Sequence, residues 1–356
     1  MKQLNDHLSM APQTRPHRRI ATRLTAAPLT ARLLATLLTA LLLITATTHA
    51  QNKPLPVIFD TDMGPDYDDV GAITLLHAFA DSGKANILAT IASTRYEGVA
   101  AVIDVFNTWF HRPNIPIGVP KTWAVGQKDW QHWTDTILAN YPHAIRNNTQ
   151  AENAVTLYRR ILANQPDHSV VIITTGFLTN LSNLLQSPPD SFSPRDGKQL
   201  VRQKVKKLVS MAGKFPQGKE FNVAKDSVAS AYVFDNWPTP ILLSGFEIGV
   251  KIKTGLPLVM NADMQNSPVK DVFRICLPMA KEDAKGRSSW DETAVLVGIA
   301  GYKPWYSTLS GRIHVLPDGS NTWEPSASGR HAYLVETPAS GEVQDLINDL
   351  IMHRPR

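Results

Sequence analysis

The sequence predicts an α/β protein with a mostly parallel central sheet flanked by helices. Short runs rich in β-branched apolar residues alternate along the chain with segments of helical period. The runs lack polar residues at every second position, which is typical of strands buried on both faces of a parallel sheet. Since 43% of the 356 residues are apolar, a large core is expected, and a chain of this length forms either one large domain or two ordinary ones.

The strands and helices follow one another in a βαβ rhythm. The predicted strands are Pro56–Phe59, Ile87–Ala92, Val170–Ile173, Lys207–Met211 and Ile241–Leu243. The predicted helices are Asp69–Ala80, Val99–Phe110, Ala151–Asn164, Leu178–Leu185 and Ser227–Asn236. A final helix, expected to dock an apolar face on the domain, carries Val343, Leu346, Ile347, Leu350 and Ile351 at helical spacing.

Two segments do not fit this rhythm. Residues 120–150 are rich in tryptophan, tyrosine and histidine and are too long for a simple connection. They form either an aromatic packing flap or a lid over a substrate site. Residues 187–197 contain three prolines and a glycine and are expected to be a turn-rich surface insertion.

Residues 1–50 resemble a signal peptide. Five arginines precede an apolar stretch from Leu33 to Ile44, and small residues end the segment at Ala50. About a dozen apolar residues are fewer than the roughly 20 that span a bilayer. We therefore expect cleavage and export to the periplasm or the medium, with no stable membrane span after processing. A retained N-terminal anchor is the alternative.

Charge and cysteine content exclude several classes of function. Six of the 36 basic residues and one of the 31 acidic residues lie in the first 50, so the remaining chain carries 30 of each. A formally neutral domain gives no support for nucleic-acid binding. Cys276 is the only cysteine, which excludes an intramolecular disulfide and a cysteine-based zinc site.

An acidic run marks the boundary between the first strand and the first helix. Five aspartates fall within ten residues, at positions 60, 62, 66, 68 and 69, with Gly64 and Pro65 forming the turn between them. Helix capping and solvation account for one or two aspartates, but not for five at a sheet edge where ligands bind. Crowded carboxylates raise one another's pKa unless a hard cation is present, so the run predicts a Ca²⁺ site.

Two other motifs place aspartates in a similar way. An EF-hand loop starting at Asp60 would need glycine sixth and glutamate twelfth, where this chain has Pro65 and Gly71. A phosphatase of the haloacid dehalogenase type begins with Asp-x-Asp after a strand, and Asp60 and Asp62 match that spacing. The phosphatase reading, with Asp60 as the nucleophile, therefore stays open.

Four segments in order resemble the inosine-uridine preferring nucleoside hydrolase family. They are the run Asp60–Asp69, the segment Thr174–Asn180, the pair Met211–Gly213 and Glu220–Val223, and Asp291 at the start of a helix. The resemblance covers roughly residues 55–300 and implies that residues 51–356 form a single nucleoside hydrolase-like catalytic domain. It also implies hydrolysis of an N-glycosidic bond to free base and ribose, by a protein that forms a homodimer or homotetramer.

The resemblance assigns roles to residues of this chain. It implies that Asp62, Asp69, Asp291 and the carbonyl of Thr175 hold Ca²⁺, with Asp62 also taking a proton from the attacking water. It further implies that Asp68, Glu220 and Asn222 contact the ribose. These are oxygen-bearing groups of the kind that bind a hard cation or hydroxyl groups.

Some positions depart from the family pattern. Trp290 stands where the family has a histidine that protonates the leaving base, and indole does not donate a proton in that way. Either the leaving group needs little protonation or His132 or His143 acts as the acid. Tyr96 and Lys214 lie near positions where the family uses sugar-binding asparagines, so a substrate other than a simple ribonucleoside stays open. Because Trp290 replaces the acid, a third alternative is a calcium-dependent nucleoside or sugar binding protein without turnover.

Overall fold

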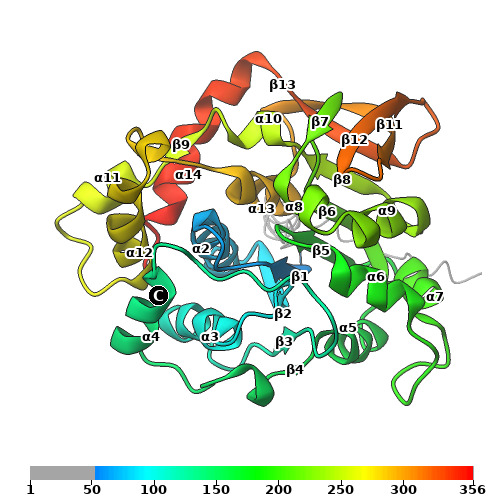
Figure 1. The fold of residues 1–356 in the computed structure, drawn as a ribbon, viewed down its shortest axis with the longest axis horizontal. Coiled ribbons are helices and arrows are strands. Elements are labelled where there is room, and N and C mark those ends of the chain that lie inside the picture. Colours follow the sequence, from blue (N-terminus) through cyan, green and yellow to red (C-terminus); the bar gives the residue numbers. More distant parts are fainter. Residues whose placement is uncertain (1–52, 356) are drawn as a thin grey trace, which may run out of the picture. The chain divides into compact units, whose positions relative to one another are not determined.

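An 11-stranded mixed sheet runs through the part of the chain that the structure describes, residues 53–355 of a computed structural model (Figure 1). Its strand order is β4-β3-β2-β1-β5-β6-β8-β13-β11-β12-β7. The predicted signal peptide lies outside the described residues. Among residues 53–355, none of the helices combines the length and the apolar character that a membrane crossing requires.

The first seven strands of that order are parallel. They are β4 (Glu152–Asn153), β3 (Ile117–Val119), β2 (Ala85–Ala92), β1 (Leu55–Thr61), β5 (Val170–Thr174), β6 (Val205–Met211) and β8 (Ile241–Ser244). All five predicted strands are confirmed. Asp60 pairs in register with Ile91 and with Thr174, so the carboxyl ends of β1, β2 and β5 meet at one edge.

The other end of the sheet is largely antiparallel and was not predicted. It contains β13 (His331–Glu336), β11 (Tyr306–Val315), β12 (Ser320–Pro325) and β7 (Gln217–Lys219). β13 still runs parallel to β8, whereas β11, β12 and β7 pair antiparallel with their neighbours (Figure 1, upper right). Polar residues interrupt β11, β12 and β7, so no apolar run marks them in the sequence. The short apolar run Ala332–Val335 of β13 was overlooked. A separate two-stranded sheet pairs β9 (Lys253–Thr254) with β10 (Arg287–Ser288).

Helices cover the sheet close to where the sequence predicts them. The predicted ones are α2 (Asp68–Asp81), α3 (Val99–Trp109), α5 (Ala154–Ala163), α6 (Thr179–Gln186), α9 (Ser227–Asn236) and α14 (Val343–Ile351). Helix α5 begins later than predicted because Asn153 caps it, accepting a hydrogen bond from the Thr156 N–H at 3.1 Å. The others are α4 (Trp133–Asn140), α7 (Gly197–Lys204), α8 (Phe221–Lys225), α10 (Phe246–Gly249), α11 (Leu256–Met260), α12 (Pro268–Cys276) and α13 (Trp290–Ala300).

The two irregular segments are better ordered than the sequence suggests. Residues 120–150 include helix α4, whose Trp133 is fully buried, and the Asp104 carboxylate accepts hydrogen bonds from the Ala144 and Ile145 N–H groups. The 187–197 segment is held by Arg159, which donates to Asp190 at 2.6 Å. The core therefore anchors both segments.

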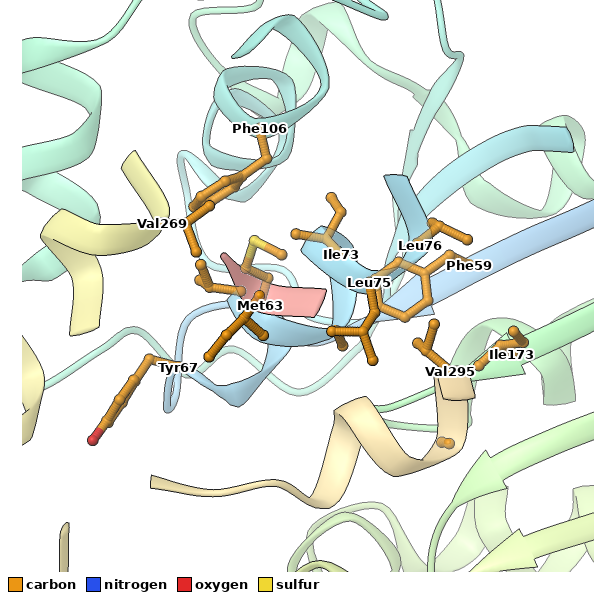
Figure 2. Packing of buried hydrophobic residues seen from close by; sticks show 14 of the residues in the cluster. Phe59, Met63, Tyr67, Ile73, Leu75, Leu76, Phe106, Ile173, Val269 and Val295 are labelled. Carbon is orange, nitrogen blue, oxygen red and sulfur yellow. The ribbon is translucent and has the colours of Figure 1, made fainter. Parts of the chain in front are cut away.

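Helix α2 is a core helix and orients the acidic run. Every residue from Asp68 to Phe79 is buried, as expected of a helix that is apolar nearly all round. Figure 2 shows its Ile73, Leu75 and Leu76 packing among Phe59 of β1, Phe106 of α3 and Val295 of α13. Because this packing fixes the start of α2, the aspartates there have little freedom to move.

Candidate active site

A small cavity opens at the carboxyl edge of the parallel strands. Its volume is about 240 Å³, at the low end for ligand sites, which suits a single small molecule. Its lining comes from several elements far apart in the sequence: Asp62, Asp66, Asp68, Thr175, Met211, Lys219, Glu220, Phe221, Asn222, Phe246, Arg287, Trp290 and Asp291. Of the calcium, sugar and base contacts predicted from the sequence, Asp69, Tyr96 and Lys214 are absent from this lining, as are Asp60 and the alternative acids His132 and His143.

The turn between β1 and α2 is fixed by Tyr96. Gly64 has φ +146°, and an added Cβ would lie 2.4 Å from the Tyr96 ring, so only glycine fits this close approach. The Tyr96 hydroxyl donates to the Met63 carbonyl at 2.9 Å. Tyr96 is 8% exposed and supports the turn from behind rather than facing the cavity.

Arg287, which was not predicted, neutralises part of the acidic run. Its guanidinium donates to Asp66 at 2.5 Å and to Asp68 at 2.8 and 3.0 Å. It also lies 5.0 Å from the centre of the Tyr67 ring and 5.1 Å from that of Trp290, within the range of cation–π contacts. Arg287 comes from β10, just before α13, and no local pattern marks it as a partner of residues some 220 positions earlier.

Asp69 differs from the two aspartates that Arg287 holds. Its Oδ1 accepts hydrogen bonds from the Thr61 and Thr175 hydroxyls, the latter at 3.0 Å. Its Oδ2 is buried and has no hydrogen-bond partner. Burial, followed by the nearby charge of Asp68, raises the pKa of Asp69 from 3.8 to about 7. A buried carboxylate oxygen without a donor is a position that a cation would satisfy.

The remaining acids at the floor of the cavity are equally crowded. Burial and the neighbouring aspartates raise the pKa of both Asp62 and Asp291 well above the ordinary value. One carboxylate oxygen from each of Asp66, Asp68 and Asp291 lies within 4.8 Å of the others. This all-oxygen donor set fits a hard divalent cation. Since Arg287 already occupies Asp66 and Asp68, the carboxylates of Asp62, Asp69 and Asp291 have less compensation.

Asp60 lies apart from this group and does not line the cavity. It accepts hydrogen bonds from the Tyr158 hydroxyl at 2.7 Å and from the Asn180 amide at 3.2 Å. Asp60 is fully buried, and burial raises its pKa to about 7. These contacts leave no route to a substrate, which weighs against Asp60 as the nucleophile of a phosphatase.

Three residues that the sequence assigned to calcium or sugar are linked to one another. The Asn222 amide donates to the Thr175 carbonyl at 2.9 Å, so the two residues are in direct contact. Glu220 is the N-cap of α8, and its carboxylate accepts from the N–H groups of Asn222, Val223 and Gly213. The sequence prediction missed this capping role. Glu220 keeps acceptor capacity toward the cavity, because a carboxylate has about four lone-pair sites.

Trp290 lines the cavity without offering an acid. Its indole Nε1 donates to the Phe246 carbonyl at 2.9 Å, and the two rings lie 5.4 Å apart. The histidines proposed as alternative acids are elsewhere: His132 contacts Asp135 at the start of α4, and His143 contacts the Tyr141 carbonyl. Neither lines the cavity. Lys214 does not line it either, but its Nζ lies 5.1 Å from the centre of the Phe246 ring.

Residues missed by the sequence analysis complete the wall. Phe246 and Phe221 supply apolar surface, Lys219 and Arg287 supply positive charge, and Asp66 joins the carboxylate group. Asp66 belongs to the acidic run and was available from the sequence. Phe221 lies within the Glu220–Val223 segment. The other three belong to the short elements β7, α10 and β10, where neither periodicity nor a local motif distinguishes them.

Comparisons with known proteins agree with this architecture. The chain can be superposed on a plant nucleoside hydrolase with a TM-score of 0.63 and 18% identity, covering 84% of this chain and 99% of that one. An inosine-uridine preferring nucleoside hydrolase from Bacillus anthracis gives a TM-score of 0.62 and 16% identity, covering 84% and 99%. A purine-preferring ribonucleoside hydrolase from Gardnerella vaginalis gives 0.63 and 15%, covering 83% and 99%.

At these identities the structural neighbours establish the fold alone. No curated protein sequence matches the chain closely enough to count as a relative. The family profile described as "Inosine-uridine preferring nucleoside hydrolase" matches residues 57–322, which is most of the chain and includes the whole lining of the cavity. The chain belongs to the inosine-uridine preferring nucleoside hydrolase family.

Proposed function

We propose that this protein is a calcium-dependent hydrolase that cleaves the N-glycosidic bond of ribonucleosides or related N-ribosides. The observation that carries the proposal is the buried, unpartnered Oδ2 of Asp69, a neighbour of Asp291, which lines the cavity together with Asp62. Membership of the family supports the reaction class.

The ion would be held by the carboxylates of Asp62, Asp69 and Asp291 and by the Thr175 carbonyl. That carbonyl already accepts from Asn222 but has a second lone pair. Calcium there would supply a positive charge that draws hydroxyl and water oxygens to the cavity floor. Arg287 supports this division, because its hydrogen bonds hold Asp66 and Asp68 in place without drawing on the other three acids.

The chain's own groups then perform the hydrolysis. Asp62 takes a proton from the attacking water as general base. Asp68, Glu220 and Asn222 orient the ribose hydroxyls through hydrogen bonds. Carboxylates close to the sugar also stabilise the positive charge that develops at the anomeric carbon.

The departing base would meet aromatic side chains here, whereas the family pattern places a histidine beside it. Trp290 and Phe246 offer flat apolar surface on which a base can stack, and neither carries a transferable proton. We therefore propose a preference for substrates whose leaving group departs with little protonation. The second candidate function, calcium-dependent binding without turnover, rests on this same missing acid.

One experiment separates the candidates. The purified protein is incubated with a panel of ribonucleosides and with a phosphate monoester, each with and without a chelator. Release of free base and ribose that stops on chelation supports the hydrolase. Calcium-dependent binding without product supports the binding protein, and phosphate release would support the phosphatase. Hydrolysis that persists after complete removal of divalent ions would refute the calcium assignment.

Export and assembly are also proposals. The arginine-rich start and the short apolar stretch within residues 1–50 support cleavage after export. N-terminal sequencing of protein recovered from the periplasm or the medium tests this, and an intact N-terminus would favour the retained anchor. A homodimer or homotetramer is proposed from family membership alone, and light scattering in solution tests it.

A further inference from the structure

Arg287 is held firmly where the acidic run meets Trp290. Its side chain is 12% exposed, and its guanidinium carbon lies 5.0 Å from the centre of the Tyr67 ring and 5.1 Å from that of Trp290. Tyr67 is fixed in turn, because its hydroxyl donates to Asp283 at 2.6 Å. Contact with two packed rings leaves the guanidinium few other positions.

The guanidinium binds the acids that lie closest together. One carboxylate oxygen from each of Asp66, Asp68 and Asp291 lies within 4.8 Å of the others, and no other acidic, histidine or cysteine side chains in residues 53–355 form such a group of three. Arg287 Nη2 donates to Asp66 at 2.5 Å and to Asp68 at 2.8 Å, and Nε adds a bond to Asp68 at 3.0 Å. The spacing of the acids alone would favour a metal ion here. A positive charge of the chain itself is already bound to two of the three.

A metal ion gains little from Asp66 and Asp68 while Arg287 is bound to them. Displacing the guanidinium would leave it with Asp283, 3.8 Å from Nη1, as its remaining ion-pair partner in the described part of the chain. Leaving a buried charge without a close partner is unfavourable. If the ion and the guanidinium shared the two carboxylates, two positive charges would lie close together and repel each other.

The other acids around the cavity remain available to an ion. None of the hydrogen bonds that the Arg287 side chain donates within the described residues reaches Asp62, Asp69 or Asp291. Asp69 keeps a buried Oδ2 without a partner. Both bonds from Arg287 to Asp68 end on Oδ1, so Arg287 leaves Oδ2 unoccupied, and this oxygen can accept a bond from a hydroxyl.

We propose that Arg287 is a positioning residue that takes the place of a second cation. It keeps Asp66 and Asp68 out of the coordination of the ion, so the ion is confined to the three acids that Arg287 does not contact. Asp68 is thereby reserved for the sugar. This inference rests on the proposed function, because it concerns the ion and the sugar contact assigned there.

The test counts the calcium ions bound by the full chain and by Arg287→Gln, using calorimetric titration with Ca²⁺. We expect one ion in the wild type and a second in the variant, because the loss of the guanidinium frees Asp66 and Asp68 to bind a metal together with Asp291. Adding Asp66→Asn to Arg287→Gln should weaken this second ion by at least about 10-fold. Since that ion would occupy Asp68, rising calcium should inhibit hydrolysis by Arg287→Gln but not by the wild type.

Two further variants separate charge from packing. Arg287→Lys keeps the positive charge but cannot donate to both carboxylates in a planar fork, so it should still bind one ion. Arg159→Gln is the matched control. Arg159 has a side chain only 3% exposed and donates to Asp190 at 2.6 and 3.0 Å, but it does not line the cavity. It should also bind one ion, and thermal unfolding checks that each variant is folded.

A second measurement leaves Arg287 in place and therefore decides the question even if Arg287→Gln does not fold. If Asp66 is not a ligand, Asp66→Asn alone should change the calcium affinity by less than about 3-fold. A loss of at least about 10-fold would show that Asp66 binds the ion despite Arg287.

The outcomes separate this inference from the proposed function. A second ion that appears in Arg287→Gln, but not in the Arg287→Lys or Arg159→Gln variants, supports the inference. Two ions in the wild type, or one ion in folded Arg287→Gln, overturns it and leaves the hydrolase standing. If the wild type binds no calcium, the calcium assignment of the proposed function fails. The gain of an ion in Arg287→Gln would then still support the role of Arg287, and no gain would refute it.

Discussion

Asp60 and Asp69 stand at the two ends of the acidic run and are alike in burial. Both are fully buried, and burial raises the pKa of each to about 7. They differ in their partners. Asp60 accepts hydrogen bonds from Tyr158 and Asn180, whereas Asp69 leaves Oδ2 without a donor.

The difference shows that burial and a raised pKa do not by themselves distinguish a structural carboxylate from a functional one. A carboxylate whose oxygens are occupied ties elements together, as Asp60 ties β1 to α5 and α6. A carboxylate with a vacant buried oxygen carries a cost that a bound cation removes. We therefore expect substitution by asparagine to remove activity at Asp69 but to leave calcium binding intact at Asp60.

The largest expected effect follows replacement of each residue by asparagine. Asp69→Asn removes a charge from the proposed ion site and should lower turnover by at least about 1,000-fold, beyond the loss of a single catalytic hydrogen bond. Asp60→Asn, the matched control, should keep calcium binding measured by calorimetry. Loss of calcium binding in the Asp60 variant but not in the Asp69 variant would show that the ion depends on Asp60 instead of Asp69.

The stability of the calcium-free protein should depend on the pH through Asp60. Its folded pKa of about 7 lies above the unfolded value of 3.8, so the folded state binds more protons between these pH values. The free energy of unfolding then falls as the pH rises from about 4 to about 7. Asp60→Asn should flatten this fall by up to about 1.4 kcal/mol per pH unit, measured by denaturant unfolding in chelator. An unchanged slope would show that Asp60 titrates normally.

Calcium should stabilise the fold more at pH 8 than at pH 5. Protons compete with the ion for Asp69 below its pKa of about 7, so binding weakens as the pH falls. At a calcium concentration 100 times Kd, binding should raise the free energy of unfolding at pH 8 by about 2.7 kcal/mol. Thermal unfolding with and without calcium at the two pH values measures it. An equal shift at both values would place the ion on groups with ordinary pKa values.

Gly176 packs against Ser93 and Asp62 and has no room for a side chain. An added Cβ would lie 2.4 Å from the Ser93 Oγ and 2.5 Å from the Asp62 backbone nitrogen. Gly176→Ala should therefore destabilise the fold by about 1–3 kcal/mol and displace Asp62, with loss of activity. Gly341→Ala is the control, since nothing lies within 4 Å of its added Cβ. Similar stability of the two variants would contradict the close packing.

The smallest expected effect concerns Trp290. Trp290→Phe removes the hydrogen bond to the Phe246 carbonyl but keeps an aromatic ring, at a cost of about 1 kcal/mol. Calcium affinity should be retained, while turnover or base preference changes. Calorimetry and a nucleoside panel measure these separately. Loss of calcium binding would place Trp290 in the metal site instead of the base pocket.

The sequence alone determined the fold class and the place of the site. Runs such as Val170–Ile173 predict strands buried on both faces, and parallel strands bring their carboxyl ends to one edge. The acidic run therefore had to lie at that edge beside Thr175, as observed. The antiparallel strand β11 was not predicted, because polar residues and a glycine interrupt its apolar pattern. They are Ser307, Thr308, Ser310 and Gly311.

Only the tertiary structure decided what each aspartate does. The partners of Asp60 lie 98 and 120 residues away, and those of Asp66 and Asp68 about 220 residues away in Arg287. Such contacts depend on how separate elements pack, which neither local propensity nor periodicity encodes. For the same reason the structure alone shows that Glu220 is a helix cap as well as a cavity residue.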